Sequence, residues 1–328
     1  ETPGAPERYT DATQFHRLDD GRRLGFQSGG ARCATPRVGC AGRGPADGLG
    51  ALGSGVRLGG VQAQRISALP QLAMMLARHY ATPAALRGLP DPDQVAPGKE
   101  GLCGILADTR VATILAGMRQ GLYPMGHVAP MKWWSPVQRC VVFPTELRIE
   151  KNLARRIRNG GYRITFDADP LGVLAGCAAV RERRWALTWI TPDMMRAALA
   201  MFDAGHMHSV EVWNAEGQLV GGLYGYAVGP VFSIESQFHI ERDTSNIATV
   251  ALLGHLSAWG FAAADGKAMT SHLKGFGFRD IPRATYRALL DGPAAGPAGR
   301  WRIDDALDIG SWNPAKGPPS RRPAARAA

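Results

Sequence analysis

Cysteine is scarce in this 328-residue chain, and its spacing excludes two common small architectures. The five cysteines are widely separated, odd in number and contain no C-x-x-C pair; they are Cys33, Cys40, Cys103, Cys140 and Cys177. A disulfide framework or a structural zinc site would need paired, closely spaced cysteines. We therefore expect neither, and a reducing, cytoplasmic location is the default.

Long apolar runs are also missing. No stretch reaches the roughly 18 apolar residues that a membrane-spanning helix requires. The N-terminal region has arginine and glycine but no compact apolar segment of the signal-peptide kind. The sequence therefore predicts no membrane-spanning helix, no signal peptide and no membrane partner.

Acidic residues are fewer than basic ones, 28 against 38, which gives a formal net charge of +10. A basic balance suits a polyanion such as RNA or an anionic membrane surface, although a basic soluble protein with a basic tail would show the same balance. Hydrophobic residues make up 45% of the chain, a normal value for a globular protein with a sizeable core.

Composition divides the chain into four stretches. The first is a poorly ordered extension with one helical segment near residues 69–78, and the last is a flexible tail rich in Pro, Ala and Arg. Between them we expect a small N-terminal α/β domain and a larger α+β domain. The predicted boundaries are 1–100, 101–165, 166–291 and 292–328.

Periodicity and capping signals predict the elements of the two central stretches. Helices are expected over 111–120, 170–177, 192–205, 245–259 and 282–290, with Asp169, Thr191 and Ser245 as N-caps. Three short strands with tight turns, at 209–213, 219–228 and 231–235, predict an antiparallel meander, and another strand is expected at 261–265. A meander, then a helix, then a strand is the order that an N-acetyltransferase-like fold requires.

Several short motifs between residues 101 and 291 together resemble one family, the leucyl/phenylalanyl-tRNA–protein transferases. No single motif is decisive, but their order and spacing agree over this whole region. The motifs are R-Q-G-L-Y-P at 119–124, W-W-S-P at 133–136, G-C-A at 176–178 with Arg181, T-W-I-T at 188–191, H-M-H-S-V-E-V-W at 206–213, V-G-G-L-Y-G at 220–225, E-S at 235–236 followed by Phe238, and H-L at 272–273 with Gly277 before I-P-R at 281–283.

The resemblance implies an N-acetyltransferase-like domain that moves Leu, Phe or Met from the 3′ end of a charged tRNA to the N-terminal amine of a protein beginning with Lys or Arg. It implies neither a metal nor coenzyme A. The expected partners are thus aminoacyl-tRNA and a basic acceptor. Aminolysis of the ester requires a neutral amine and stabilisation of a tetrahedral intermediate.

Three residues are candidates for the chemistry. Asp265 matches the catalytic-centre Asp of the family, and strand alternation would place Lys267 beside it as a partner. The family usually has Gln at the second position, so Lys267 is a departure: an ammonium repels a cationic acceptor, yet it could stabilise an oxyanion or hold the tRNA terminus. Glu235 matches a family Glu that helps to bind the acceptor. Without the resemblance, all three would be read as ordinary surface charges.

An apolar pocket for the aminoacyl side chain is the second expected site, although core packing would give the same pattern. Compared with the family, this set loses aromatic surface, so the preferred aminoacyl group is left open. The expected lining is Met125, Trp189, Leu223, Phe232, Leu252, Leu256 and Ala264.

Two arginine groups could grip tRNA phosphates, or could be solvated surface. They are Arg155, Arg156, Arg158 and Arg163, and then Arg181, Arg183 and Arg184. His206 and His208 have no evident third metal ligand, so structural hydrogen bonding is the prediction for them.

Three other functions compete. A coenzyme A-dependent acetyltransferase would need a pyrophosphate-binding turn at a helix start, and the nearest match, at 272–277, has the wrong first residue and position. A second competitor acylates a small molecule or a different peptide from aminoacyl-tRNA. A third binds tRNA or peptide without catalysis, because of Lys267.

Overall fold

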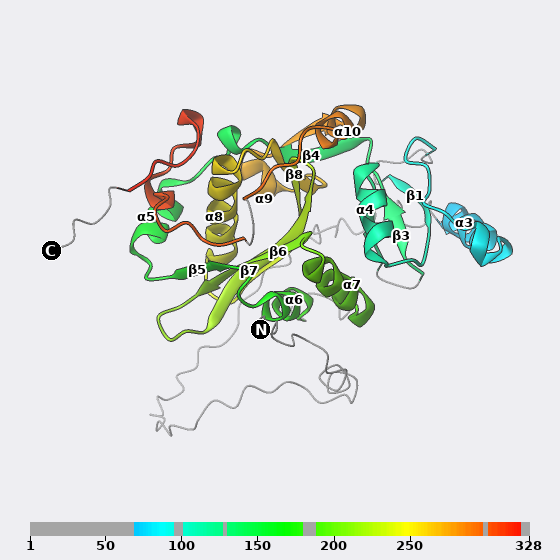
Figure 1. Cartoon of the computed structure of the whole chain (residues 1–328), viewed down its shortest axis with the longest axis horizontal. Helices are drawn as coiled ribbons and strands as arrows, with labels where there is room; N and C mark the ends of the chain where they lie inside the picture. The colour runs from blue at the N-terminus through cyan, green and yellow to red at the C-terminus, as the bar shows by residue number, and fades with distance from the viewer. Residues whose placement is uncertain (1–68, 95–100, 127–129, 180–187, 298–300, 323–328) are drawn as a thin grey trace, which may run out of the picture. The chain divides into compact units, whose positions relative to one another are not determined.

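The computed structural model of the chain describes residues 69–94, 101–126, 130–179, 188–297 and 301–322 (Figure 1). All of these belong to one compact unit, Ala68–Ala328. Of the extension predicted over 1–100, residues 1–68 and 95–100 lie outside the described residues. Its predicted helical segment near 69–78 is described: helix α3 spans Leu69–Ala81.

A mixed seven-stranded sheet organises the described part of the chain, in the order β10-β4-β9-β8-β7-β6-β5. Neighbouring strands are antiparallel except β8 and β9, which are parallel and are joined through helix α8, Thr244–Ala258. The strands are β4 Gln138–Val142, β5 Arg163–Phe166, β6 Met207–Trp213, β7 Leu219–Val228, β8 Val231–His239, β9 Ala263–Lys267 and β10 Arg279–Pro282. The predicted meander and the α+β class are confirmed.

A second sheet has three antiparallel strands in the order β1-β3-β2. They are β1 Leu102–Ile105, β2 Tyr123–Met125 and β3 Lys132–Trp134. The other helices are α4 Val111–Arg119, α5 Lys151–Asn159, α6 Pro170–Ala178, α7 Pro192–Asp203, α9 Ser271–Gly275 and α10 Arg283–Leu290, with 3-10 turns at η1 Ala84–Leu86, η2 Pro144–Glu146, η3 Ile309–Ser311 and η4 Pro314–Lys316.

Two of the three predicted N-caps form as expected. The side chain of Asp169 accepts a hydrogen bond from the Gly172 amide, and that of Thr191 accepts one from the Met194 amide, so each satisfies an amide of the first helical turn. The third prediction is wrong. Helix α8 starts one residue before Ser245, and its N-cap is Asp243 in a left-handed conformation with φ 68°.

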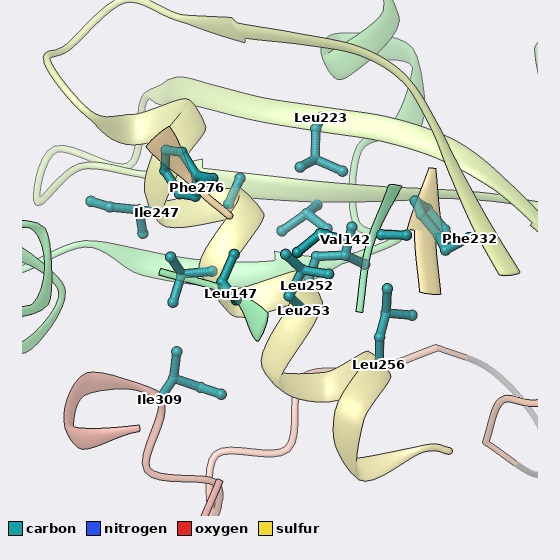
Figure 2. Packing of buried hydrophobic residues seen from close by; sticks show 14 of the residues in the cluster. Val142, Leu147, Leu223, Phe232, Ile247, Leu252, Leu253, Leu256, Phe276 and Ile309 are labelled. Atoms are coloured by element: carbon teal, nitrogen blue, oxygen red, sulfur yellow. The ribbon is translucent and has the colours of Figure 1, made fainter. Parts of the chain in front are cut away.

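The two faces of the large sheet carry different helices. A side chain on Gly221 would collide with Thr244 at the start of α8, whereas one on Gly222 would meet Val173 of α6. Since adjacent strand residues point to opposite faces, α8 covers one face and α6 the other, as Figure 1 shows. Figure 2 shows the apolar cluster on the α8 face, where Leu252 and Leu256 of the helix pack with Phe232 of β8.

The C-terminal segment corrects one prediction. Trp301, Leu307, Ile309 and Trp312 are buried in the same cluster, so residues 301–322 are not a flexible tail. The guanidinium of Arg158 also donates to the Gly310 carbonyl oxygen across 2.8 Å. Composition pointed the other way because Pro and Ala are frequent there, but a few large apolar anchors are enough to fix an irregular segment.

The predicted domain boundary at residue 165 is also wrong. It passes through β5, and β4 on its N-terminal side is an interior strand of the large sheet, between β10 and β9. The pairing of β4 joins residues far apart in the sequence, such as Val141 with Asp265. Local composition contains no signal for such a non-local pairing, so the boundary could not be read from it.

Candidate functional site

Asp265 is the centre of a buried polar cluster on the sheet face away from α8. Its side chain is fully buried and accepts five hydrogen bonds. Two come from Arg139, at 2.8 Å from Nε and 2.7 Å from Nη2. The others come from the Ser233 hydroxyl at 2.8 Å, the Lys267 amide at 2.7 Å and the Tyr286 hydroxyl at 3.1 Å. A carboxylate has about four lone-pair sites, so Asp265 is saturated.

Arg139, on β4, is enclosed by aromatic rings. Its guanidinium carbon lies 4.7 Å from the centre of the Tyr123 ring and 4.5 Å from that of Tyr286. Its side chain is only 2% exposed. Tyr123 belongs to β2 of the small sheet and Tyr286 to α10, so this one cation joins three elements. Cation–π contacts and a bidentate carboxylate are the partners that a buried guanidinium needs.

Lys267 pairs with Glu235, not with Asp265 as expected. Its ammonium nitrogen lies 2.9 Å from Oε1 of Glu235, and it donates to the Ile234 carbonyl oxygen at 2.6 Å and to the Ser233 hydroxyl at 3.2 Å. These contacts use all three N–H donors of an ammonium. The Lys267 and Glu235 side chains are 13% and 2% exposed, so neither is an ordinary surface charge.

The direction in which the Glu235 side chain points follows from a β-bulge in β8. Tyr224 pairs with Ser236 and Gly225 pairs with Ile234, which leaves Glu235 as the extra residue. A bulge changes the alternation of side chains and often re-aims one of them beside an active site.

A second bulge lies opposite the first, in β9. Asp265 pairs with Val141 and Lys267 pairs with Cys140, so Gly266 is unpaired. Lys267 itself has φ 64°, a left-handed conformation that side-chain-bearing residues rarely adopt. This left-handed conformation explains why the pairing predicted from strand alternation does not form. The backbone amide of Lys267 contacts Asp265, whereas its ammonium does not.

The parallel pairing of β8 and β9 ends between the two bulges. Its register runs through Val231, Phe232 and Ser233 and goes no further. Beyond this point the Lys267 ammonium bonds the Ile234 carbonyl, so a side chain bridges the split where the backbone ladder stops. The charged cluster therefore occupies the place where two strands of one sheet separate.

The two carboxylates of the cluster are shifted in opposite directions. Burial is the largest influence on the pKa of Asp265 and acts to raise it, but the charges and hydrogen bonds of Arg139 and Lys267 together outweigh burial and hold the pKa at about 2. Burial raises the pKa of Glu235, and Lys267 opposes only part of that effect. Asp265 is thus a fixed anion, whereas Glu235 is the carboxyl group that protonates more readily.

Most of the predicted aminoacyl pocket lies on the other face. Five of its residues are fully buried in the cluster under α8: Leu223, Phe232, Leu252, Leu256 and Ala264. Trp301 packs against them, with its ring 5.5 Å from that of Phe232. Trp189 and Met125 are half-buried and lie outside this cluster.

The first arginine group lies around α5 and β5, and three of its members have contacts within the chain. Arg156 pairs with Asp243 at 3.3 Å, Arg158 binds Gly310, and Arg163 lies over the Trp213 ring at 5.0 Å. Arg155 is exposed. The second group, Arg181, Arg183 and Arg184, lies outside the described residues.

His208 has the structural role that was predicted. Its Nδ1 lies 2.8 Å from Asp167, and its ring stacks on Trp301 at 3.9 Å. The pKa of His206 is lowered, chiefly by burial and then by the positive charge of Arg119.

Sequence reasoning missed four residues of the cluster: Arg139, Tyr123, Ser233 and Tyr286. Arg139 and Asp265 are 126 positions apart, and no local pattern connects them. Tyr123 did appear in one of the family motifs, but only as a marker of resemblance. The one available signal was the alternation at the start of β8, before its bulge, which puts Ser233 on the face opposite Phe232.

A buried, charge-compensated cluster at a strand split is a candidate catalytic centre, and comparisons with known proteins show that the chain is a transferase. The profile of the family described as "Leucyl/phenylalanyl-tRNA protein transferase" matches residues 141–291. A protein of that name from Alkalilimnicola ehrlichii is 39% identical over 222 residues, covering 67% of this chain and 86% of the relative. One from Aromatoleum aromaticum is 40% identical over 233 residues, covering 68% and 96%.

The chain therefore belongs to the leucyl/phenylalanyl-tRNA–protein transferase family, and it is a transferase. Among solved structures, the L-PGS of Bacillus licheniformis is similar with a TM-score of 0.30 and 13% identity, covering 46% of this chain and 47% of that one. A likeness this weak carries no conclusion. Within the part of the chain that the structure describes, no helix is both long enough and apolar enough to cross a membrane.

Proposed function

We propose that this chain transfers an aminoacyl group, Leu, Phe or Met, from charged tRNA to the N-terminal amine of a protein. The observation that carries the proposal is the 39–40% identity to transferases of this name over more than 220 residues. The charged cluster at the strand split supports it, because it lies at the positions where the family resemblance puts the chemistry.

The reaction sets clear demands on the site. The acceptor ammonium loses a proton, and the neutral amine attacks the ester carbonyl. A C–N bond forms, the ester C–O bond breaks, and the ribose oxygen leaves with a proton. Because the ester is already activated, positioning supplies much of the rate. We assign proton removal to the Glu235 side of the cluster, since Asp265 has no lone pair left for the amine.

A basic first residue, Lys or Arg, is the acceptor that the family resemblance implies, and Glu235 is the carboxylate that would meet it. In the free protein Lys267 already lies 2.9 Å from Glu235. The acceptor's cation would then have to compete with Lys267. This contact also favours a second acceptor class, a peptide whose first side chain is uncharged or a small-molecule amine.

Two regions of the molecule are proposed to bind the charged tRNA, which is the donor of the aminoacyl group. We propose that the aminoacyl side chain enters the apolar region lined by the predicted pocket residues, which requires that region to open. Exposed Arg155 and its neighbours on α5 are proposed to contact tRNA phosphates.

For the fold and location we propose an N-acetyltransferase-like domain in a cytoplasmic protein. Support comes from the meander β6-β7-β8 followed by α8 and a parallel β9. We also propose that the small sheet β1-β3-β2 is the core of the family's smaller N-terminal part.

The test is a transfer assay with labelled Leu, Phe and Met on tRNA. Acceptors are matched peptides that begin with Lys, Arg or Ala, and the enzymes are wild type and Lys267→Gln. Wild-type transfer to the Lys and Arg peptides supports the full proposal, and equal or better transfer to the Ala peptide supports the second acceptor class. Absence of transfer from every donor to every peptide, with tRNA binding intact, would contradict protein acylation and leave small amines as acceptors.

A further inference from the structure

Arg139 connects the large sheet to β2 of the small sheet and to α10. It binds both carboxylate oxygens of Asp265, and its Nη1 donates to the Gly121 carbonyl oxygen at 3.3 Å. The rings of Tyr123 and Tyr286 confine it from two elements. A guanidinium held this way has a single geometry, because its planar fork must match the carboxylate while its faces meet the rings.

The contacts continue from Arg139 to the reactive pair. Asp265, fixed by Arg139, accepts the Lys267 amide at 2.7 Å. That amide belongs to a residue in the left-handed region, a conformation that persists only where its surroundings enforce it. The same conformation carries the Lys267 ammonium across the strand split to Glu235 and Ile234. Two contacts thus connect Arg139 to the residue whose ammonium lies against Glu235.

We infer that Arg139 is a positioning residue for aminoacyl transfer: it orients the Asp265 carboxylate, and through Asp265 it fixes the backbone twist that places Lys267 against Glu235. The inference rests on the proposed function. Arg139 touches neither substrate in this scheme. Its removal should therefore affect the transfer step more than the binding of charged tRNA.

Several ionisable groups interact electrostatically with Asp265 or with its partner Arg139, and they come from the elements around the cluster. They are Arg139 and Cys140 of β4, Lys267 of β9, Glu235 of β8, Tyr286 of α10 and Tyr123 of β2. Of these, Arg139 and Lys267 lower the pKa of Asp265. Without Arg139, burial dominates and that pKa rises, so an acidic limb should enter the pH profile of transfer.

The experiment compares wild type with Arg139→Lys and Arg139→Gln. Arg139→Lys keeps the charge but loses the bidentate fork, and we expect kcat to fall at least tenfold with KM for charged tRNA within twofold. Arg139→Gln should lose at least a hundredfold, and its rate relative to wild type should fall further as pH is lowered from 8 to 5. Taking this ratio at each pH cancels the titration of the acceptor amine.

Two controls separate positioning from folding. Arg279→Gln removes an exposed arginine on β10 that pairs with Glu146, and it should leave kcat unchanged. The double variant Arg139→Gln/Asp265→Asn removes both buried charges, so it should recover the thermal midpoint that Arg139→Gln loses while staying inactive.

The inference is overturned by a wild-type kcat in Arg139→Lys, or by an Arg139→Gln defect that is independent of pH and proportional to the unfolded fraction. A wild-type enzyme that transfers to no peptide would instead sink the proposed function, and this inference with it.

Discussion

The two faces of the large sheet bury opposite kinds of side chain, apolar on one and charged on the other. These side chains come from neighbouring residues of the same strands. On the α8 face, Phe232 and Ala264 are packed among apolar side chains. On the other face, their sequence neighbours Ser233 and Asp265 belong to a charged cluster that is equally buried. The apolar face is stable because contact replaces water, whereas the charged face is stable only while each charge keeps its partner. Chemistry can be placed on the second face because the first supplies the rigidity.

Among the variants, we expect Asp265→Ala to have the largest effect, because it breaks the central pair of the charged face. The substitution leaves the Arg139 guanidinium buried without its carboxylate, and a broken buried pair costs roughly 3–5 kcal/mol of unfolding free energy. We expect a loss of that size in urea denaturation, together with loss of transfer. Asp265→Ala/Arg139→Met should recover much of the stability but none of the activity. A single variant as stable as wild type would show that the charged face does not depend on this pair.

Trp301→Ala tests how much the C-terminal segment contributes to the stability of the apolar face. The indole packs against His208, Phe232 and Trp259, and its removal leaves a cavity lined by rings. We expect a loss of roughly 3 kcal/mol, measured by urea denaturation. The exposed neighbour Arg302 provides the matched control, because Arg302→Ala should change stability by less than about 0.5 kcal/mol. Equal, small effects of both variants would mean that the segment is not part of the core.

Some of this architecture could be predicted because its signals are local. Helix α7 has its cap at Thr191 and its left-handed terminating Gly205, and the meander has alternation and turns. The C-terminal anchors and strand β4 could not be predicted, because neither has a repeating pattern. Their positions depend on contacts with distant parts of the chain.

The same division applies to the site. Asp265, Glu235 and Lys267 were identified through a resemblance, and the structure brings these three residues together. Their pairing was predicted wrongly, since two facing bulges replace the regular alternation on which the prediction depended. Gly266 is a signal that the prediction did not use, because an isolated glycine inside a strand often marks a bulge, whereas the bulge at Glu235 has no such signal.

Acid should weaken the charged face, because the Asp265 carboxylate titrates there. The folded pKa of Asp265, about 2, lies below its ordinary value of 3.8, so its ionised form stabilises the fold. That contribution is fully present above about pH 4 and is lost as pH falls through about 2, amounting to about 2 kcal/mol. Glu235, with a raised pKa, contributes with the opposite sign. Urea denaturation of wild type and Asp265→Asn between pH 5 and 2 should show a difference that shrinks with acid; a constant difference would exclude the linkage.

The smallest expected effects come from two serine variants, which distinguish residues of the charged face that only stabilise the fold from residues that also affect transfer. Ser233 on β8 donates to Asp265, and Ser209 on β6 donates to another buried carboxylate, Glu211. Each Ser→Ala change removes one charge-assisted hydrogen bond, which costs about 1.5 kcal/mol. Only Ser233 also contacts the Lys267 ammonium, at 3.2 Å. We therefore expect similar losses in urea denaturation for both variants but a decrease in transfer for Ser233→Ala alone, by about tenfold or 1.4 kcal/mol of activation free energy. Equal transfer rates would show that the cluster tolerates the loss of one contact, and would confine the reactive part of the face to Glu235 and Lys267.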